Sequence, residues 1–169
     1  REVADGEVGE LFSRTSYVFD GYWKNPQKTA EAFEDEWCSV GDIARRDAEG
    51  YIWLVDRKSN MIISGGENVY PTEVENALGQ HRAVRDVAVI GVPHAKWGET
   101  VHAVVVLHEG RSATESELRH WCRERLAGFK CPSGVTFIAD EEMPRTATGK
   151  VQHRVLRQRT IRRGAGAGW

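Results

Sequence analysis

The sequence has little cysteine, no long apolar run and no excess of positive charge. Each of these absences argues against one class of protein. Its three cysteines, Cys38, Cys122 and Cys131, have neither CxxC nor metal-ligand spacing. We therefore expect a reducing cytoplasm rather than a disulfide framework, and no metal site. No apolar run approaches membrane-spanning length, and no secretory signal opens the chain.

The charge balance also argues against nucleic acid as a partner. The formal net charge is −2, so the chain has no global basic field. Residues 154–163 are rich in arginine, but a solvated helix face is the more common explanation of such a run. The 169 residues suit one domain or a small pair of domains. The chain begins with Arg1 rather than Met, which suggests a fragment or a processed product.

The first 55 residues indicate strands and one short helix. Asn25-Pro26 predicts a helix start, because Asn is a favoured N-cap and Pro is tolerated at the first helical position. Residues 37–45 and 51–55 are typical of two strands joined by a turn. So short a stretch is marginal for a core of its own. We interpret it as the end of a larger domain, and we expect it to be disordered or paired with a second copy of the chain.

Strands and helices alternate after residue 60. Thr114 and Glu117 form a capping-box pattern at the start of one of the helices. The β-branched runs favour strands that are covered on both faces. The expected strands are residues 87–92, 102–107 and 135–139. Of the three expected helices, one begins at Pro71, one begins at Thr114 and the last spans residues 151–159.

Residues 50–70 are the most informative stretch. An apolar run ends in the polar joint 56–60, and a second apolar run then meets Ser64-Gly65-Gly66. Paired glycines permit positive φ and let a ligand approach the backbone closely. Taken alone, the stretch indicates a β-hairpin.

Three motifs, in this order, resemble those of the adenylate-forming enzymes: the acyl-CoA synthetases, adenylation domains and luciferases. The first is Val40-Gly41-Asp42, which by itself is weak. The second spans residues 56–75 and is highly specific. The third is the loop Pro144-Arg-Thr-Ala-Thr-Gly149-Lys150. The resemblance covers the chain to about residue 156.

The resemblance implies a role for particular residues. Asp42 would accept hydrogen bonds from the ribose hydroxyls of ATP, and Arg57 would contact the same ribose. Lys150 would be the catalytic lysine. The pantetheine tunnel would be lined by Gly65, Gly66 and Glu67.

The resemblance also implies a hinge at Ser59, next to Lys58, about which the small domain rotates between two half-reactions. An aspartate or lysine is usual at the hinge, so Ser59 departs from the family pattern. The family's phosphate loop, adenine motif and acyl pocket do not occur in these 169 residues. The resemblance therefore predicts that a large N-terminal adenylation domain is the missing partner.

We thus expect an α+β fold: a β-rich remnant of the large domain (1–56), a small mobile domain with a central sheet flanked by helices (57–163), and a flexible tail (164–169). The predicted function is that of an ATP-dependent acyl-CoA ligase with ATP, Mg²⁺, CoA and a fatty or aromatic acid as reactants. Two alternatives stay open at this point, an adenylation domain that loads a carrier protein and a non-catalytic module that binds CoA or a partner. The sequence leaves the oligomeric state open.

Overall fold

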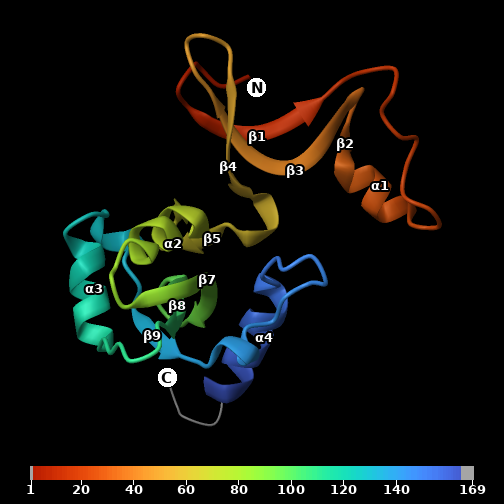
Figure 1. The fold of residues 1–169 in the computed structure, drawn as a ribbon. Coiled ribbons are helices and arrows are strands. Elements are labelled where there is room, and N and C mark those ends of the chain that lie inside the picture. The colour runs from red at the N-terminus through yellow and green to blue at the C-terminus, as the bar shows by residue number, and fades with distance from the viewer. Residues whose placement is uncertain (1, 165–169) are drawn as a thin grey trace. The chain divides into compact units, whose positions relative to one another are not determined.

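The computed structural model describes residues 2–164 and divides the chain into two compact units, which are shown in Figure 1. The first unit ends at Ser59 and the second begins at Asn60. Residues 57–59, expected in the small domain, thus group with the first unit. Of the expected tail, residues 165–169 lie outside the described part, and Gly164 is the last residue of a helix.

The first unit is an antiparallel four-stranded sheet with one short helix. Strand β3 (Trp37–Arg46) lies at its centre. It pairs with β1 (Val8–Ser13) along one edge and with β4 (Ile52–Arg57) and β2 (Phe33–Glu34) along the other. Helix α1 (Pro26–Ala32) starts as predicted, because the Asn25 side chain accepts from the Lys28 backbone N–H at 3.0 Å.

Much of the apolar surface of this unit is uncovered. Tyr51, which precedes β4, and Ile52, Trp53 and Leu54 on β4 are each more than half exposed. The described part of residues 1–55 is thus a paired sheet, where we expected disorder or pairing with a second copy. Its bare apolar strand is what a sheet lacking a neighbour would leave exposed.

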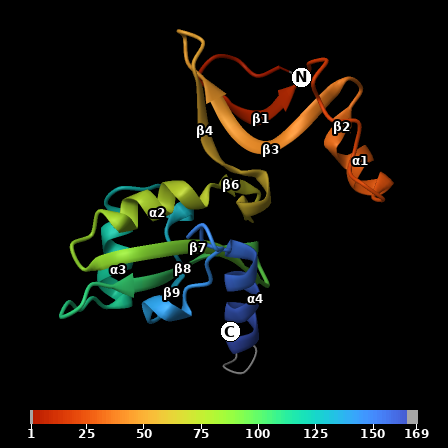
Figure 2. The same ribbon diagram turned by 45° about the vertical axis from the view of Figure 1, so that its right-hand side comes forward.

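The second unit is built on a five-stranded mixed sheet. Its strands are β5 (Ile62–Ser64), β6 (Glu67–Val69), β7 (Val84–His94), β8 (Gly98–Leu107) and β9 (Gly134–Phe137). Strand β8 is central: β7 pairs antiparallel along one edge, and β9 (parallel) and β5 lie on the other. Figure 2 shows β7 and β8 running side by side.

Helices cover both faces of this sheet. Alternate side chains of a strand point to opposite faces, and β7 and β8 are apolar on both. Helices α2 (Pro71–Gly79) and α3 (Glu115–Arg123) pack on the face that carries Val89 and Val105. Helix α4 (His153–Gly164) packs on the face of Ile90 and Val104. The predicted α+β class and the prediction of doubly covered strands are confirmed.

The helix boundaries follow their capping residues. In α3, Thr114 accepts from the Glu117 N–H, and Glu117 accepts from the Thr114 N–H, which is the predicted capping box. Short 3-10 turns occupy η1 (Lys58–Asn60), η2 (Gly128–Lys130) and η3 (Asp140–Glu142). The last helix begins at His153 rather than at residue 151, because Val151 pairs with Arg145 across the preceding loop.

Candidate functional site

The first unit brings the two predicted nucleotide residues together. Asp42 on β3 lies opposite Arg57 on β4 in the sheet register. The Arg57 Nε lies 2.9 Å from the Asp42 Oδ1. The Arg57 side chain is 64% exposed, whereas that of Asp42 is 19% exposed. The guanidinium therefore keeps free N–H groups at the surface, next to a carboxylate that it orients.

Lys58 is held to the same unit by Glu10 on β1, whose side chain is largely buried. Its Nζ lies 2.6 Å from Glu10 Oε2, and the Ser39 hydroxyl donates to Glu10 Oε1 at 2.5 Å. Burial by itself would raise the pKa of Glu10, but the hydrogen bonds from Lys58 and Ser39 and the Lys58 charge lower that pKa overall. Glu10 therefore stays ionised and fixes Lys58.

The predicted hinge residue lies at the division between the units. Ser59 is exposed in the middle of η1, and it is the last residue of the first unit. Arg57 and Lys58 before it are both tied to the first unit by ion pairs. Ser59 is therefore the first residue after these two anchored side chains.

Gly65 and Gly66 form the two-residue turn of the β5–β6 hairpin. Their φ angles are +61° and +88°, and the register pairs Ser64 with Glu67 across the turn. Two consecutive positive φ angles are the requirement of a type I′ turn, which glycine meets without strain. The glycines thus close a hairpin of β5 and β6, whereas the apolar run before residue 56 pairs with β3 instead. Gly65, Gly66 and Glu67 are all exposed.

Trp97, in the turn between β7 and β8, covers one of the two glycines. The Gly65 N–H donates to the Trp97 carbonyl at 3.0 Å, and a Cβ on Gly65 would lie 2.9 Å from the Trp97 ring. Around Gly66 there is open space. The ring is 46% exposed and carries the Lys96 ammonium 4.4 Å from its centre. The turn therefore presents a bare backbone beside an exposed aromatic ring.

Lys150 lies at the end of a closed loop. The Thr146 N–H donates to the Lys150 carbonyl at 2.8 Å, and the Gly149 N–H donates back to the Thr146 carbonyl at 2.9 Å. Gly149 has φ +83°, which favours glycine there. The Lys150 side chain is exposed, and it makes no hydrogen bond or ion pair with the described residues. Its ammonium is available to a ligand.

Arg145 anchors the base of this loop. It forms ion pairs with Asp86 on β7 and, at 3.6 Å, with Asp140. The hydrogen bond to Asp86 is the main reason that the pKa of Arg145 is raised above its already high value. The Gln152 amide also donates to the Arg145 carbonyl at 2.8 Å. The base of the loop is therefore fixed, and the Lys150 side chain extends from this fixed base.

A second anchor of the loop had no predicted role. His153, three residues after Lys150, has its Nε2 2.8 Å from Glu75 Oε1 on α2, and the same oxygen accepts from the Val89 N–H at 2.8 Å. The only sequence signal was that Glu75 closes the second motif. No local pattern predicts that a histidine 78 positions later meets it.

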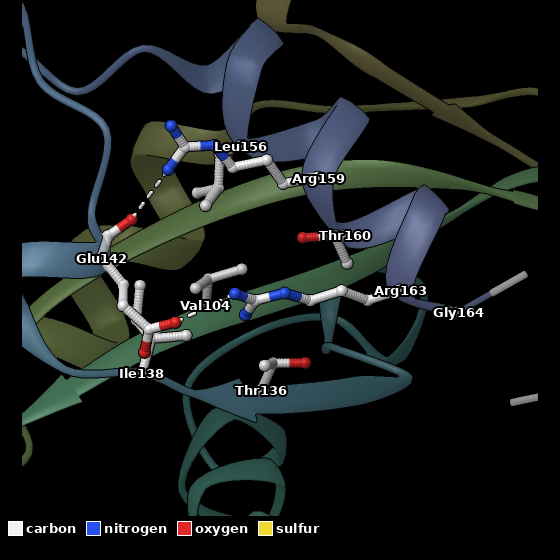
Figure 3. A pocket seen from close by; sticks show the side chains of 9 residues that line it. All are labelled: Val104, Thr136, Ile138, Glu142, Leu156, Arg159, Thr160, Arg163 and Gly164. Carbon is white, nitrogen blue, oxygen red and sulfur yellow. Dashed lines mark hydrogen bonds and ion pairs between the residues drawn. The ribbon is translucent and has the colours of Figure 1, made fainter. Parts of the chain in front are cut away.

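A pocket of the second unit lies away from the predicted site residues. This cavity of about 200 Å³ lies between α4 and the sheet, and its lining residues, which are shown in Figure 3, include Glu142 and Arg163, joined by an ion pair. None of the predicted site residues lines it. Within residues 2–164 no group of three or more His, Cys, Asp or Glu side chains could hold a metal ion. No helix in the same range is long and apolar enough to cross a membrane.

A family model supports the motif-based prediction. Residues 73–150 match the model of the AMP-binding enzyme C-terminal domain. The match begins two residues before Glu75 and ends at Lys150, so it covers most of α2, the strands β7 to β9 and the lysine loop.

Known proteins are similar over almost the whole chain. A feruloyl-CoA synthase of Amycolatopsis is 46% identical over 157 residues, which are 93% of this chain and 32% of that protein. A long-chain-fatty-acid–CoA ligase of Bacillus subtilis is 43% identical, over 91% of this chain and 27% of the ligase. The structure of ATP-bound MatB from Rhodopseudomonas palustris superposes with a TM-score of 0.88 at 39% identity, covering 95% of this chain and 32% of MatB. The chain spans about a third of the length of the relatives it matches.

Proposed function

Because residues 73–150 match the model of the AMP-binding enzyme C-terminal domain, we propose that this chain is the C-terminal part of an AMP-forming acyl-CoA ligase. The complete enzyme would join a carboxylic acid to AMP, release pyrophosphate and transfer the acyl group to CoA. Its missing partner is the large N-terminal adenylation domain. The relatives named for feruloyl-CoA and long-chain acyl-CoA synthesis favour an aromatic or fatty acid as substrate.

One observation carries the proposal: a single compact unit presents two differently built loops. One ends in an unpartnered ammonium on an anchored base, and the other is a bare glycine turn beside an exposed ring. The two half-reactions have different needs, since the first develops charge on phosphate oxygens and the second requires room for a thin pantetheine arm. The two loops match these needs.

In the first half-reaction, Lys150 would contact the carboxylate of the acid and the α-phosphate. A lysine ammonium is a compact charge that can be aimed at the oxygens where negative charge shifts, and no proton transfer is required of it. The anchored base of its loop would keep the ammonium preorganised. Asp42 would accept hydrogen bonds from the ribose hydroxyls, and Arg57, which it orients at 2.9 Å, would donate to the same ribose.

In the second half-reaction, the Gly65-Gly66 turn would line the pantetheine path and Glu67 its rim. The absence of side chains at the turn lets the arm approach the backbone. Use of both loops in one active site requires the second unit to rotate between the steps, and we place the pivot at Ser59. Its position at the division of the two units supports this assignment.

Mg²⁺ would enter this reaction with ATP, whose phosphates supply hard oxygen ligands. The described residues hold no cluster that could bind a metal on its own, so no metal ligand is assigned in this chain. We further propose a cytoplasmic location, which the three free thiols support.

Replacement of Lys150 by alanine in the full-length enzyme tests the proposal. We expect acyl-adenylate formation to fall by about 10²-fold or more, the scale of one lost preorganised charge contact. Thioester formation from supplied acyl-adenylate should persist, because it uses the glycine turn. Single-turnover assays of the two half-reactions measure both.

Arg154→Ala is the matched control. Arg154 is an exposed cation on α4 with no ion pair among the described residues, so its loss should leave both steps unchanged. Unchanged adenylation in Lys150→Ala would exclude the catalytic assignment. Equal loss of both steps in that variant would indicate a folding defect and contradict the division of labour between the loops.

A further inference from the structure

We infer that Arg157 on α4 is a positioning residue for the glycine turn, acting through Glu99 on β8. The functional part of this inference rests on the function proposed above, but its structural part does not. Arg157 lies on the helix that follows the Lys150 loop, so its sequence position gives no reason to connect it with the other loop.

The first link joins α4 to the sheet. The Arg157 Nε donates to the Gly91 carbonyl on β7 at 2.7 Å, and its Nη2 lies 2.5 Å from Glu99 Oε1. A planar guanidinium can make both bonds at once because its donors form a fixed fork. The arginine therefore fixes the direction of the Glu99 carboxylate.

The second link joins Glu99 to the strand that enters the turn. Its other oxygen, Oε2, accepts from the Ile63 N–H on β5 at 3.3 Å. The carboxylate fits there because Gly91 has no side chain: a Cβ on Gly91 would lie 3.0 Å from Oε2. Ile63 is two residues before Gly65, so one carboxylate connects α4 with the start of the turn.

This connection matters because β5 pairs only briefly with β8. The strand has three residues, and its register with β8 consists of the single pair Ser64 and Gly98. The Gly65 N–H bond to the Trp97 carbonyl is the next contact along the chain. The β5–β6 ladder and the burial of Ile62 and Val69 hold the rest of the hairpin. Removal of the Glu99 bond would therefore loosen the attachment of β5 to β8 at the entrance of the turn.

A fully exposed ion pair contributes little to stability, and the Arg157 side chain is 45% exposed. Three features distinguish this pair. Glu99 is only 27% exposed, the arginine also bonds a backbone carbonyl, and the carboxylate also accepts from a backbone N–H. The pair is thus the middle of a chain of charge-assisted bonds across four elements.

The Lys150 loop has anchors of its own. Arg145 binds Asp86, and His153 contacts Glu75. Neither anchor involves Glu99 or Ile63. Loss of Arg157 should therefore disturb the glycine turn and leave the lysine loop in place.

Amide hydrogen exchange followed by NMR on the 169-residue chain tests the structural part. In Arg157→Gln we expect the Ile63 and Gly65 amides to exchange about tenfold faster, the scale of one lost hydrogen bond. Glu99→Gln should have a similar effect, and Arg157→Lys, which keeps the charge, a smaller one. Arg154→Gln on the same helix should leave both amides unchanged.

Two outcomes would overturn the inference. Unchanged exchange at Ile63 and Gly65 in Arg157→Gln would show that the bond chain does not hold the turn. A uniform increase across β7 and β8 would show that Arg157 only stabilises the unit as a whole.

The full-length enzyme tests the functional part. In Arg157→Gln the KM for CoA should rise about tenfold, as expected for one misplaced contact, while adenylation stays at its original rate. A matching loss in adenylation would overturn the functional part. The exchange experiment does not depend on enzyme activity, so its result remains valid even if the proposed ligase function is wrong. Failure of the structural inference can therefore be distinguished from failure of the proposed function.

Discussion

At the residue scale, Gly65 and Gly66 are identical neighbours with different surroundings. Both have positive φ, which costs an L-amino acid about 1–2 kcal/mol. Only at Gly65 would a Cβ also meet the Trp97 ring, at 2.9 Å. The Trp97 backbone is held beside the turn, because its carbonyl accepts the Gly65 N–H. The need for glycine is therefore conformational at one position, and conformational and steric at the other.

We predict that Gly65→Ala destabilises the second unit more than Gly66→Ala does. The difference should be about 1 kcal/mol or more, the cost of overpacking one methyl group. Urea unfolding of the 169-residue chain measures it, with Gly66→Ala as the matched control for the φ penalty. Equal destabilisation by the two variants would mean that the Trp97 ring does not confine the turn.

At the element scale, the short turn η1 is fixed on one side. Lys58 is held by Glu10, and the pKa of Glu10 is lowered because its bonds to Lys58 and Ser39 outweigh the effect of burial. Arg57 is held by Asp42. Ser59 is the first residue after these two ion pairs. It is exposed, and it is the last residue of the first unit. A change of backbone direction at this point need not break either pair.

We predict that Ser59→Pro slows thioester formation far more than adenylation in the full-length enzyme. Proline fixes φ and removes the N–H, and on the proposed mechanism only the second step follows the rotation. Single-turnover measurements of the two half-reactions decide the matter. Ser59→Ala, which keeps the backbone freedom, is the control, and equal losses in both steps with Ser59→Pro would make Ser59 an ordinary turn residue.

At the scale of the whole molecule, the two units differ in how completely they bury their apolar residues. The second unit covers both faces of its sheet with helices. The first leaves most of β4 uncovered, with Leu54 67% exposed. This difference agrees with a chain that spans about a third of its relatives' length.

We predict that the 169-residue chain by itself does not adenylate a carboxylic acid. It carries Asp42, Arg57 and Lys150, but no phosphate loop or acyl pocket occurs in its sequence. Pyrophosphate release from ATP with a panel of aromatic and fatty acids measures this, with a full-length relative as the positive control. Reproducible turnover that depends on the added acid would contradict the proposed division of the enzyme.

The sequence by itself determined the elements and the nature of the loops. The capping box at Thr114 and the N-cap at Asn25 depend on contacts within one helical turn. The hairpin at Gly65-Gly66 depends on backbone freedom. Such interactions are local, so residue type and spacing contain the information. The resemblance of residues 40–42, 56–75 and 144–150 to a known family added the candidate roles.

Only the tertiary structure decided which distant side chains meet. It paired Asp42 with Arg57, Glu75 with His153 and Glu99 with Arg157. It also moved the start of α4 to His153, since Val151 pairs across the lysine loop. These contacts join residues that are 15 to 78 positions apart, and they arise because the sheet register and the packing of α4 bring separate segments together. Residue type predicts that a charge needs a partner, but only the fold selects which partner it has.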